Sequence, residues 1–341
     1  MNRINRRWVL KNRPVGAITS DVLALESVPL PELAEGQVLV RNIWLSLDPT
    51  NRIWMSDREQ YLPPVELGAV MRGGTLGVVE ESRDPNFTPG MLVSPGLSGW
   101  QDYEVAWGAM CRALPAIPGI HPTAFMSVLG VTGWTAYFGL LDIGQPKPNE
   151  TVVVSAAAGA VGSIVGQIAR IKGARVIGIA GGPDKCRWLV EELGFDGAID
   201  YRSEDVGAAL DRLCPNGIDV NFENVGGPIM DAVMERMNDF SRMPLCGMIS
   251  TYNAEGEVPG PRFFDRVLMR RIRVQGFIVI DYFPRMEEAV TALAGWLLEG
   301  RLKYKVHVEH GLENAPDALG RLFTGNHDGK LLVQIGPEPA G

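Results

Sequence analysis

A short run of small residues at positions 156–162 carries the clearest sign of chemistry in the sequence. It reads Ala-Ala-Ala-Gly-Ala-Val-Gly, follows an apolar, β-branched run at 151–155 and opens a stretch with helical periodicity. Gly159 can adopt backbone angles closed to other residues, which lets the main chain approach a pyrophosphate. The N–H groups at a helix start, and the helix dipole, favour negative charge. Because it lies between a predicted strand and a predicted helix, the run predicts a dinucleotide phosphate loop. The alternative is a tight turn that packs a helix on a sheet.

The end of the next predicted strand indicates which dinucleotide binds. A site for NAD would place Asp or Glu there, about 20 residues beyond the glycines, to bind the ribose hydroxyls. This chain instead has Ile179-Ala180-Gly181-Gly182. With no carboxylate to repel it, a 2′-phosphate could meet Lys185, with Arg187 as a weaker candidate. The sequence therefore predicts NADP(H) as the cofactor. The alternative for Lys185, which follows Asp184, is a solvated residue in the first turn of a helix.

No zinc site is expected from the pattern of possible ligands. Such a site needs Cys, His and acidic side chains that converge on the metal. Without a metal, charge that develops on a substrate oxygen must be met by hydrogen-bond donors or by the cofactor's ribose. This favours a reaction that forms a delocalised anion. The histidines and cysteines are scattered along the chain, at His121, His307, His310, His327, Cys111, Cys186, Cys214 and Cys246.

The elements that must position the loop are those of an α/β domain. After His121, short apolar strands alternate with stretches of helical period, which is typical of a parallel sheet with crossover helices. A doubly wound sheet of this kind holds its ligand beyond the carboxyl ends of the strands. Six strands are predicted, near 151–155, 175–179, 198–201, 219–222, 243–246 and 274–279.

The rest of the chain predicts a second, mostly β domain. Residues 1–125 are strand-like and rich in turns, and strand-like runs at 304–308 and 331–335 flank a short helical stretch near 316–323. We therefore expect a substrate domain over 1–125 that 300–341 completes, and a nucleotide-binding domain over 126–299.

Composition indicates an acidic protein without an affinity for nucleic acid or membranes. The 341 residues include 46% hydrophobic and 21% charged side chains, with a net charge of −8. The uncharged run 151–169 is long enough for a membrane span, but its content of Gly, Ala and Ser favours a buried strand, turn and helix. The basic N-terminal arm lacks the apolar stretch of a secretory signal, and the cysteines are widely spaced, so we expect reduced thiols and a cytoplasmic protein.

The motifs of the chain resemble, nearly end to end, those of a known family. This is the zinc-free leukotriene B4 12-hydroxydehydrogenase and prostaglandin reductase branch of the medium-chain dehydrogenase/reductase superfamily. Several long motifs in the same order are more specific than the glycine loop alone. They lie at 7–10 (RWVL), 45–49 (LSLDP), 71–74 (MRGG), 133–137 (GWTAY), 158–163 (AGAVGS), 223–227 (ENVGG), 246–253 (CGMISTYN) and 329–330 (GK).

The resemblance implies an α/β subunit that pairs as a homodimer and reduces the C=C bond of α,β-unsaturated ketones or aldehydes with NADPH. Its fold would combine a Rossmann-type, doubly wound six-stranded parallel sheet with a GroES-like, mostly β catalytic domain. Each implied cofactor residue also has a plain structural reading: Tyr201 as a strand-end aromatic, 224–227 as a simple turn and 277–279 as sheet core. The implied residues are Gly159, Ala160, Val161 and Gly162 at the pyrophosphate, Lys185 and Tyr201 at the 2′-phosphate, and Thr135, Asn224, Cys246, Gly247, Ser250, Thr251, Tyr252, Phe277, Ile278 and Val279 along the rest of the cofactor.

The resemblance also implies a catalytic role for Tyr252. Hydride addition to the β-carbon would leave an enolate, whose oxygen a ribose hydroxyl and Tyr252 would hydrogen-bond. The alternative is a tyrosine that caps the turn in which it lies. The proton for the α-carbon could come from Tyr252 or from solvent, and the sequence leaves both open.

Two positions depart from the family pattern. Many relatives have a tyrosine near the substrate directly after Leu-Asp-Pro, where this chain has Thr50. Relatives also carry Gly-x-Asn-x-Gly-Lys near the C-terminus, where this chain has His327 in place of the asparagine. Substrate preference is therefore not transferred. A quinone reductase and a non-catalytic NADPH-binding sensor remain the alternatives.

Overall fold

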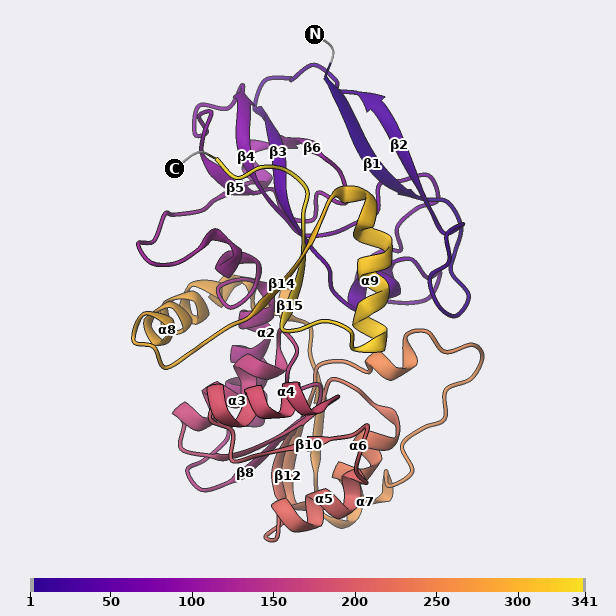
Figure 1. The fold of residues 1–341 in the computed structure, drawn as a ribbon, viewed down its shortest axis with the longest axis vertical. Helices are drawn as coiled ribbons and strands as arrows, with labels where there is room; N and C mark the ends of the chain where they lie inside the picture. The colour runs from indigo at the N-terminus through magenta and orange to yellow at the C-terminus, as the bar shows by residue number, and fades with distance from the viewer. Residues whose placement is uncertain (1–2, 340–341) are drawn as a thin grey trace. The chain divides into compact units, whose positions relative to one another are not determined.

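The computed structural model describes residues 3–339, which form two compact units (Figure 1). The N-terminal unit comprises the chain up to Met126, Val306–His327 and the residues from Leu331 onward. The central unit comprises Ser127–Lys305 and Asp328–Lys330. The chain therefore crosses between the units several times, and three residues close to its C-terminus belong to the central unit.

The N-terminal unit is mostly β, as predicted. A two-stranded antiparallel sheet pairs β1 (Ile4–Leu10) with β2 (Leu23–Pro29). A seven-stranded sheet has the order β14-β15-β3-β4-β5-β7, and β6 pairs with β3 off this path. Its strands are β3 (Gln37–Ser46), β4 (Thr75–Ser82), β5 (Leu92–Ser94), β6 (Tyr103–Trp107), β7 (Arg112–Ala113), β14 (Val306–His310) and β15 (Lys330–Gln334).

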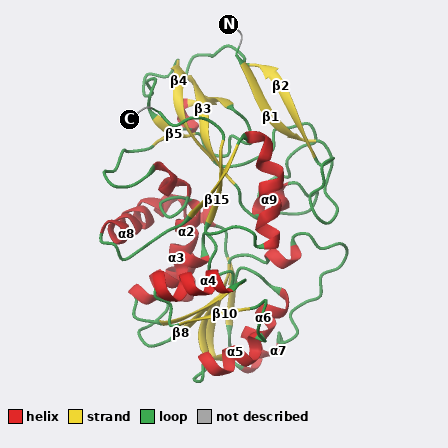
Figure 2. Ribbon diagram, in the orientation of Figure 1, coloured by secondary structure: helices red, strands yellow, loops and turns green. Residues whose placement is uncertain are grey.

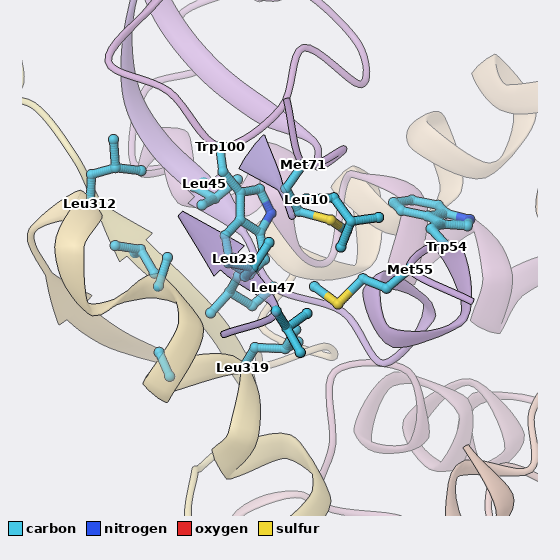
Figure 3. Close-up of a cluster of buried hydrophobic side chains, with 14 of the residues drawn as sticks. Leu10, Leu23, Leu45, Leu47, Trp54, Met55, Met71, Trp100, Leu312 and Leu319 are labelled. Carbon is cyan, nitrogen blue, oxygen red and sulfur yellow. The ribbon is translucent and has the colours of Figure 1, made fainter. Parts of the chain in front are cut away.

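A hydrophobic core joins the two ends of the chain within this unit (Figure 3). Leu45 and Trp100 are buried together with Leu312 and Leu319, which come from the C-terminal part of the chain. Because burial of apolar surface contributes about 25 cal/mol per Å², this cluster stabilises the packing of the C-terminal segment on the N-terminal strands of the unit. The helical segments of the unit are α1 (Thr50–Trp54), η1 (Gly108–Met110), η2 (Pro122–Met126), η7 (Leu312–Asn314) and α9 (Ala315–Thr324).

The central unit contains the predicted six-stranded parallel sheet. Its order is β10-β9-β8-β11-β12-β13, so the direction of winding reverses between β8 and β11. In doubly wound sheets, ligands bind beyond the carboxyl ends of the strands at such a reversal. The strands are β8 (Thr151–Val154), β9 (Arg175–Ala180), β10 (Gly197–Asp200), β11 (Ile218–Phe222), β12 (Met237–Leu245) and β13 (Arg273–Gly276).

The last strand is shorter than the sequence predicts, so Phe277, Ile278 and Val279 lie beyond it. The Phe277 ring packs edge-on against Phe222 at 6.3 Å between ring centroids and against Tyr282 at 6.4 Å. Val279 already starts the next helical turn, η6. Phe277 therefore packs against aromatic rings and does not extend the strand pairing of β13.

Helices cover both faces of this sheet (Figure 2). Leu210 and Val233, from α5 and α6, are buried with Ile177 of β9. Gly178 points to the opposite face, where it meets Phe195, and Phe195 also contacts Gly166 of α3. The helical segments are α2 (Val131–Phe138), η3 (Gly139–Gly144), α3 (Gly162–Ile171), α4 (Pro183–Arg187), η4 (Trp188–Glu192), α5 (Val206–Leu213), α6 (Gly227–Met234), η5 (Ile249–Thr251), α7 (Asp265–Met269), η6 (Val279–Arg285) and α8 (Met286–Leu298).

The uncharged run 151–169 forms β8, the glycine loop and most of α3. Within the described part of the chain, no helix combines the length and the hydropathy that crossing a bilayer requires.

Candidate nucleotide-binding site

The loop between β8 and α3 folds back on itself so tightly that only glycine fits at its end. A Cβ atom on Gly162 would lie 2.5 Å from the carbonyl oxygen of Ala156 and 2.8 Å from the Cα of Ala157. The Gly159 N–H donates to the same carbonyl of Ala156 at 3.0 Å. Ala157 is held in turn by its N–H bond to Ile179 of β9 (2.9 Å). The start of α3 is therefore fixed directly beyond the end of the sheet.

In the part of the chain that the structure describes, two N–H groups at the start of α3 have no backbone acceptor, whereas those of Ser163 and Ile164 donate to the carbonyls of Gly159 and Val161 at 3.1 Å. No side chain caps the helix, and within residues 3–339 no backbone carbonyl accepts a hydrogen bond from the N–H groups of Val161 or Gly162. Donors at a helix N-terminus, together with the helix dipole, bind phosphate groups. The tight loop at 156–162 and the N–H groups of Val161 and Gly162 thus fit a diphosphate.

A segment from the far end of the chain lies against this loop. Gly329 forms an isolated parallel bridge with Gly159, and the N–H of Lys330 donates to the carbonyl of Lys305 at 2.8 Å. Gly329 has φ of +62°, and a Cβ there would lie 2.2 Å from the Lys305 carbonyl oxygen. His327, two residues earlier, belongs to the N-terminal unit, where its Nδ1 lies 3.3 Å from the Arg321 carbonyl. Sequence reasoning did not predict this contact with the phosphate loop.

A basic corner lies at the end of β9. A Cβ on Gly181 would be 2.9 Å from both the Tyr201 hydroxyl and Nε of Arg202, so both side chains lie against this glycine. Lys185 is in α4, which begins directly after Gly182. Burial lowers the pKa of Lys185, as do the nearby cations Arg202 and Lys305, whereas Asp328 raises it. The predicted residues Lys185 and Tyr201 therefore have two further cationic neighbours that sequence reasoning missed.

Asp200 ties the two turns of this corner together. One carboxylate oxygen accepts hydrogen bonds from the N–H groups of Gly182 (2.7 Å) and Arg202 (3.0 Å), and the other accepts from Ser203 (2.9 Å). Desolvation raises the pKa of Asp200, but the hydrogen bonds together outweigh it and hold the pKa below its usual value. The weaker candidate, Arg187, pairs instead with Asp184 at 3.2 Å.

A buried carboxylate, Glu223, organises the turn after β11. Its Oε1 accepts hydrogen bonds from the Ser155 hydroxyl (2.9 Å), the Val225 N–H (2.7 Å) and the Gly226 N–H (2.8 Å). Its Oε2 accepts from the Asn221 side chain at 3.0 Å. The Asn224 amide donates to the Ser155 carbonyl at 2.7 Å, so it is bound to the end of β8. The ends of β8 and β11 are thus fixed together through side chains.

The turn after β12 is fastened to the same group of residues. The N–H groups of Cys246 and Gly247 donate to the Glu223 carbonyl, and the Ser250 hydroxyl donates to the Val225 carbonyl at 2.6 Å. Burial raises the pKa of the Cys246 thiol to about 12, with a further contribution from the Glu223 charge, so the thiol is neutral at physiological pH. The predicted residues of this stretch therefore lie beside Asn224.

Tyr252 closes this turn. Its hydroxyl oxygen accepts a hydrogen bond from the Met248 N–H at 3.1 Å, and the Thr251 hydroxyl donates to the Met248 carbonyl at 2.8 Å. Tyr252 therefore does cap the turn. A phenol that accepts a hydrogen bond still carries a proton that it can donate, so this contact leaves the catalytic role chemically possible.

Two of the predicted positions lie in helical or aromatic packing. The Thr135 hydroxyl donates to the Val131 carbonyl at 2.8 Å, within its own helix α2. Phe277 is packed against Phe222 and Tyr282, as described above. Ile278 and Val279 follow it and are half-buried.

A phenol of the N-terminal unit lies beside Thr50, the position at which the family pattern has a tyrosine. The Tyr61 hydroxyl is hydrogen-bonded to the Thr50 hydroxyl. Burial raises the pKa of Tyr61, and the hydrogen bond to Thr50 offsets part of this effect. Tyr61 was missed because it lies in a loop with no periodic pattern, 11 residues from Thr50.

Comparison with known proteins places the chain in a family. A family model for the N-terminal domain of oxidoreductases matches residues 6–114, and a model for zinc-binding dehydrogenases matches 160–295. NADPH-dependent curcumin reductase of Escherichia coli is 46% identical over 336 residues, which are 97% of each chain. The chain belongs to the medium-chain dehydrogenase/reductase superfamily, in its zinc-free alkenal and enone reductase branch. This confirms the resemblance stated from the sequence.

Other members of this superfamily are similar over the same length. Bovine prostaglandin reductase 1 is 37% identical and covers 96% of this chain and 98% of its own. The crystal structure of CurA from Vibrio vulnificus in complex with NADPH has a TM-score of 0.93, with 46% identity over 98% of this chain and 100% of that one. The matched model is named for zinc, but within residues 3–339 no group of three or more His, Cys, Asp or Glu could hold a metal ion.

We expect the substitution Glu223→Gln to destabilise this reductase by about 1–3 kcal/mol, because the glutamine NH₂ would face donors that the carboxylate now accepts from. The free energy of unfolding, from urea denaturation, measures this. The substitution Glu235→Gln is the matched control, since the Glu235 side chain is 42% exposed and forms an ion pair with its neighbour Arg236. Equal stability of the two variants would show that Glu223 does not organise the turn.

Proposed function

We propose that this protein uses NADPH to reduce the C=C bond of α,β-unsaturated ketones and aldehydes. The observation that carries this is the pairing of an uncapped phosphate loop with a basic corner at Gly181, in a chain similar to named reductases over nearly its full length. One of these, from Nicotiana tabacum, is a 2-alkenal reductase that is 37% identical over 98% of this chain.

The proposed binding of the cofactor follows the order of the loops along the sheet edge. Residues 159–162 bind the diphosphate, and Lys185 and Tyr201 bind the 2′-phosphate. Asn224, Cys246, Gly247 and the 250–252 turn contact the middle of the cofactor, while Thr135 and 277–279 contact its nicotinamide half. When bound, NADPH supplies the hydride that adds to the β-carbon of the substrate.

Tyr252 is the proposed donor to the substrate oxygen. The Met248 N–H bond holds the phenol oxygen in place and polarises the O–H toward donation. A donor that is already oriented stabilises an enolate oxygen without reorganising during the reaction. Tyr252 therefore stabilises the negative charge that develops on the enolate oxygen. This role is compatible with either source of the proton for the α-carbon, Tyr252 or solvent.

Tyr61 is the proposed phenol of the substrate side. Its hydrogen bond to Thr50 places an aromatic hydroxyl next to the position where the family pattern has a tyrosine. We infer that the pair Thr50 and Tyr61 together contact the substrate in place of that single side chain.

The proposal predicts that purified protein oxidises NADPH in the presence of enones and enals, and does so much more slowly with NADH. Absorbance at the NADPH band, followed over a panel of acceptors, measures both rates. Simple quinones in the same panel separate the alternative of a quinone reductase, which would turn over quinones faster than enones. NADPH binding without turnover of any acceptor would favour the non-catalytic sensor and contradict the proposal.

We expect Tyr252→Phe to lower kcat by about 10²-fold, because one hydrogen bond to the developing oxyanion is lost. The dissociation constant for NADPH should stay unchanged, which separates this effect from a damaged cofactor site. Tyr103→Phe, in β6 of the N-terminal unit, serves as a matched control and should retain full activity. A Tyr252→Phe variant with wild-type kcat would remove Tyr252 from the chemistry.

A homodimer and a cytoplasmic location complete the proposal. The strand β13 lies at the edge of the central sheet, and α7 exposes Leu268 (74%) and Met269 (62%) close to it in the chain. An open strand edge beside exposed apolar side chains is suited to a second copy of the chain. Light scattering should give twice the 37.1 kDa monomer mass. Leu268→Glu should yield monomers while Leu298→Glu, also exposed, should not; a monomeric wild-type protein would contradict the dimer.

A further inference from the structure

Asp328 is held beside the phosphate loop by its backbone. The next residue, Gly329, bridges to Gly159, and the Lys330 N–H bonds to the Lys305 carbonyl at 2.8 Å. At Gly329 a positive φ and the Lys305 carbonyl, 2.2 Å from a Cβ position, exclude other residues. Asp328 therefore has little freedom to move away from the loop, although it is 143 residues further along the chain than Lys185.

The carboxylate of Asp328 lies within a group of cations. Its Oδ2 is 3.4 Å from Nζ of Lys305, and that ammonium group also lies 5.5 Å from the centre of the Trp188 ring. Lys185 is close enough for the Asp328 charge to raise its pKa, against the dominant effect of burial. Asp328 is thus an anion among the side chains that give this corner its positive charge.

The other carboxylates of the corner are engaged elsewhere. Asp200 accepts hydrogen bonds from Gly182, Arg202 and Ser203, as described above. Asp184 is 90% exposed and pairs with Arg187 at 3.2 Å. Asp328, in contrast, pairs with Lys305, and its charge also acts on Lys185.

We propose that Asp328 sets the selectivity of this protein between NADPH and NADH by competing with the 2′-phosphate for Lys185 and Lys305. A phosphate monoester carries a charge near −2 at neutral pH, so it is repelled by an adjacent carboxylate and must share that carboxylate's cations. NADH has a hydroxyl at this position and does not compete. Asp328 thus weakens NADPH binding and leaves NADH binding unaffected. The inference rests on the proposed role of Lys185 at the 2′-phosphate.

The test is the ratio of dissociation constants for NADPH and NADH in Asp328→Asn, measured by fluorescence titration or calorimetry. The amide keeps the size of the side chain and an oxygen that accepts from Lys305. We expect NADPH to bind about two- to fivefold more tightly, as the loss of a partly exposed ion pair allows. NADH affinity should not change, and the gain should shrink as salt is raised. Unchanged or weaker NADPH binding, or an equal change for both nucleotides, would overturn the inference.

Two companion variants make the result specific. Asp328→Glu keeps the charge and should retain the wild-type ratio. Asp184→Asn removes the same charge from a residue next to Lys185 in the chain, and should change the ratio less than Asp328→Asn does. An equal effect of Asp184→Asn would overturn the inference, because it would indicate a general effect of net charge.

Lys185→Gln separates this inference from the proposed function. If this variant keeps the wild-type ratio of the NADPH to the NADH dissociation constant, the proposed 2′-phosphate site is wrong. If it raises the ratio of the NADPH to the NADH dissociation constant while Asp328→Asn has no effect, the site is correct and only the role of Asp328 fails. In the double variant with Lys185→Gln, Asp328→Asn should improve NADPH binding less than it does in the wild-type background. One of the two cations for which Asp328 and the 2′-phosphate compete is then absent.

Discussion

The close approach of Gly162 to the carbonyl of Ala156 is the constraint on which the rest of the central unit depends. Any side chain at Gly162 would overlap that carbonyl, so the tight turn from β8 into α3 requires glycine at this position. Within residues 3–339 the N–H groups of Val161 and Gly162, at the start of α3, donate to no backbone carbonyl. A helix start without a cap is normally a cost to stability, and an anion bound there offsets it. The tight turn into α3 therefore explains both why residue 162 is glycine and why an anionic ligand would bind there.

The loops around this turn are held by side-chain and backbone bonds between distant parts of the chain. Glu223 binds the ends of β8 and β11 together through Ser155, and the backbone of the 246–247 segment bonds to its carbonyl. Asp200 does the same for the turns after β9 and β10. Each carboxylate takes several backbone or side-chain donors that no regular element satisfies. Strand ends that sequence separates by tens of residues thus become one edge, which is where an extended dinucleotide needs its contacts.

Sequence reasoning predicted the sheet and the loop because both have local signals. Four of the six strands, β8 to β11, were predicted close to their observed bounds from apolar runs, whereas β12 starts earlier, at Met237, and β13 ends earlier, at Gly276. Phe277, directly after β13, packs its ring against Phe222 and Tyr282, and no periodicity in the sequence encodes this packing. Arg202, Lys305, Asp328 and Tyr61 were missed for a related reason. Their neighbours are set by turn geometry and by pairing across long stretches of chain, such as that of Gly159 with Gly329.

The most direct measurement is of backbone amide signals for residues 156–162 by nuclear magnetic resonance, while NADPH is added. If the diphosphate binds the start of α3, the N–H resonances of Val161 and Gly162 shift strongly and their exchange with solvent slows. The Lys185 side-chain signals should change with NADPH and much less with NADH. NADPH binding that leaves the Val161 and Gly162 amides unperturbed would contradict the account.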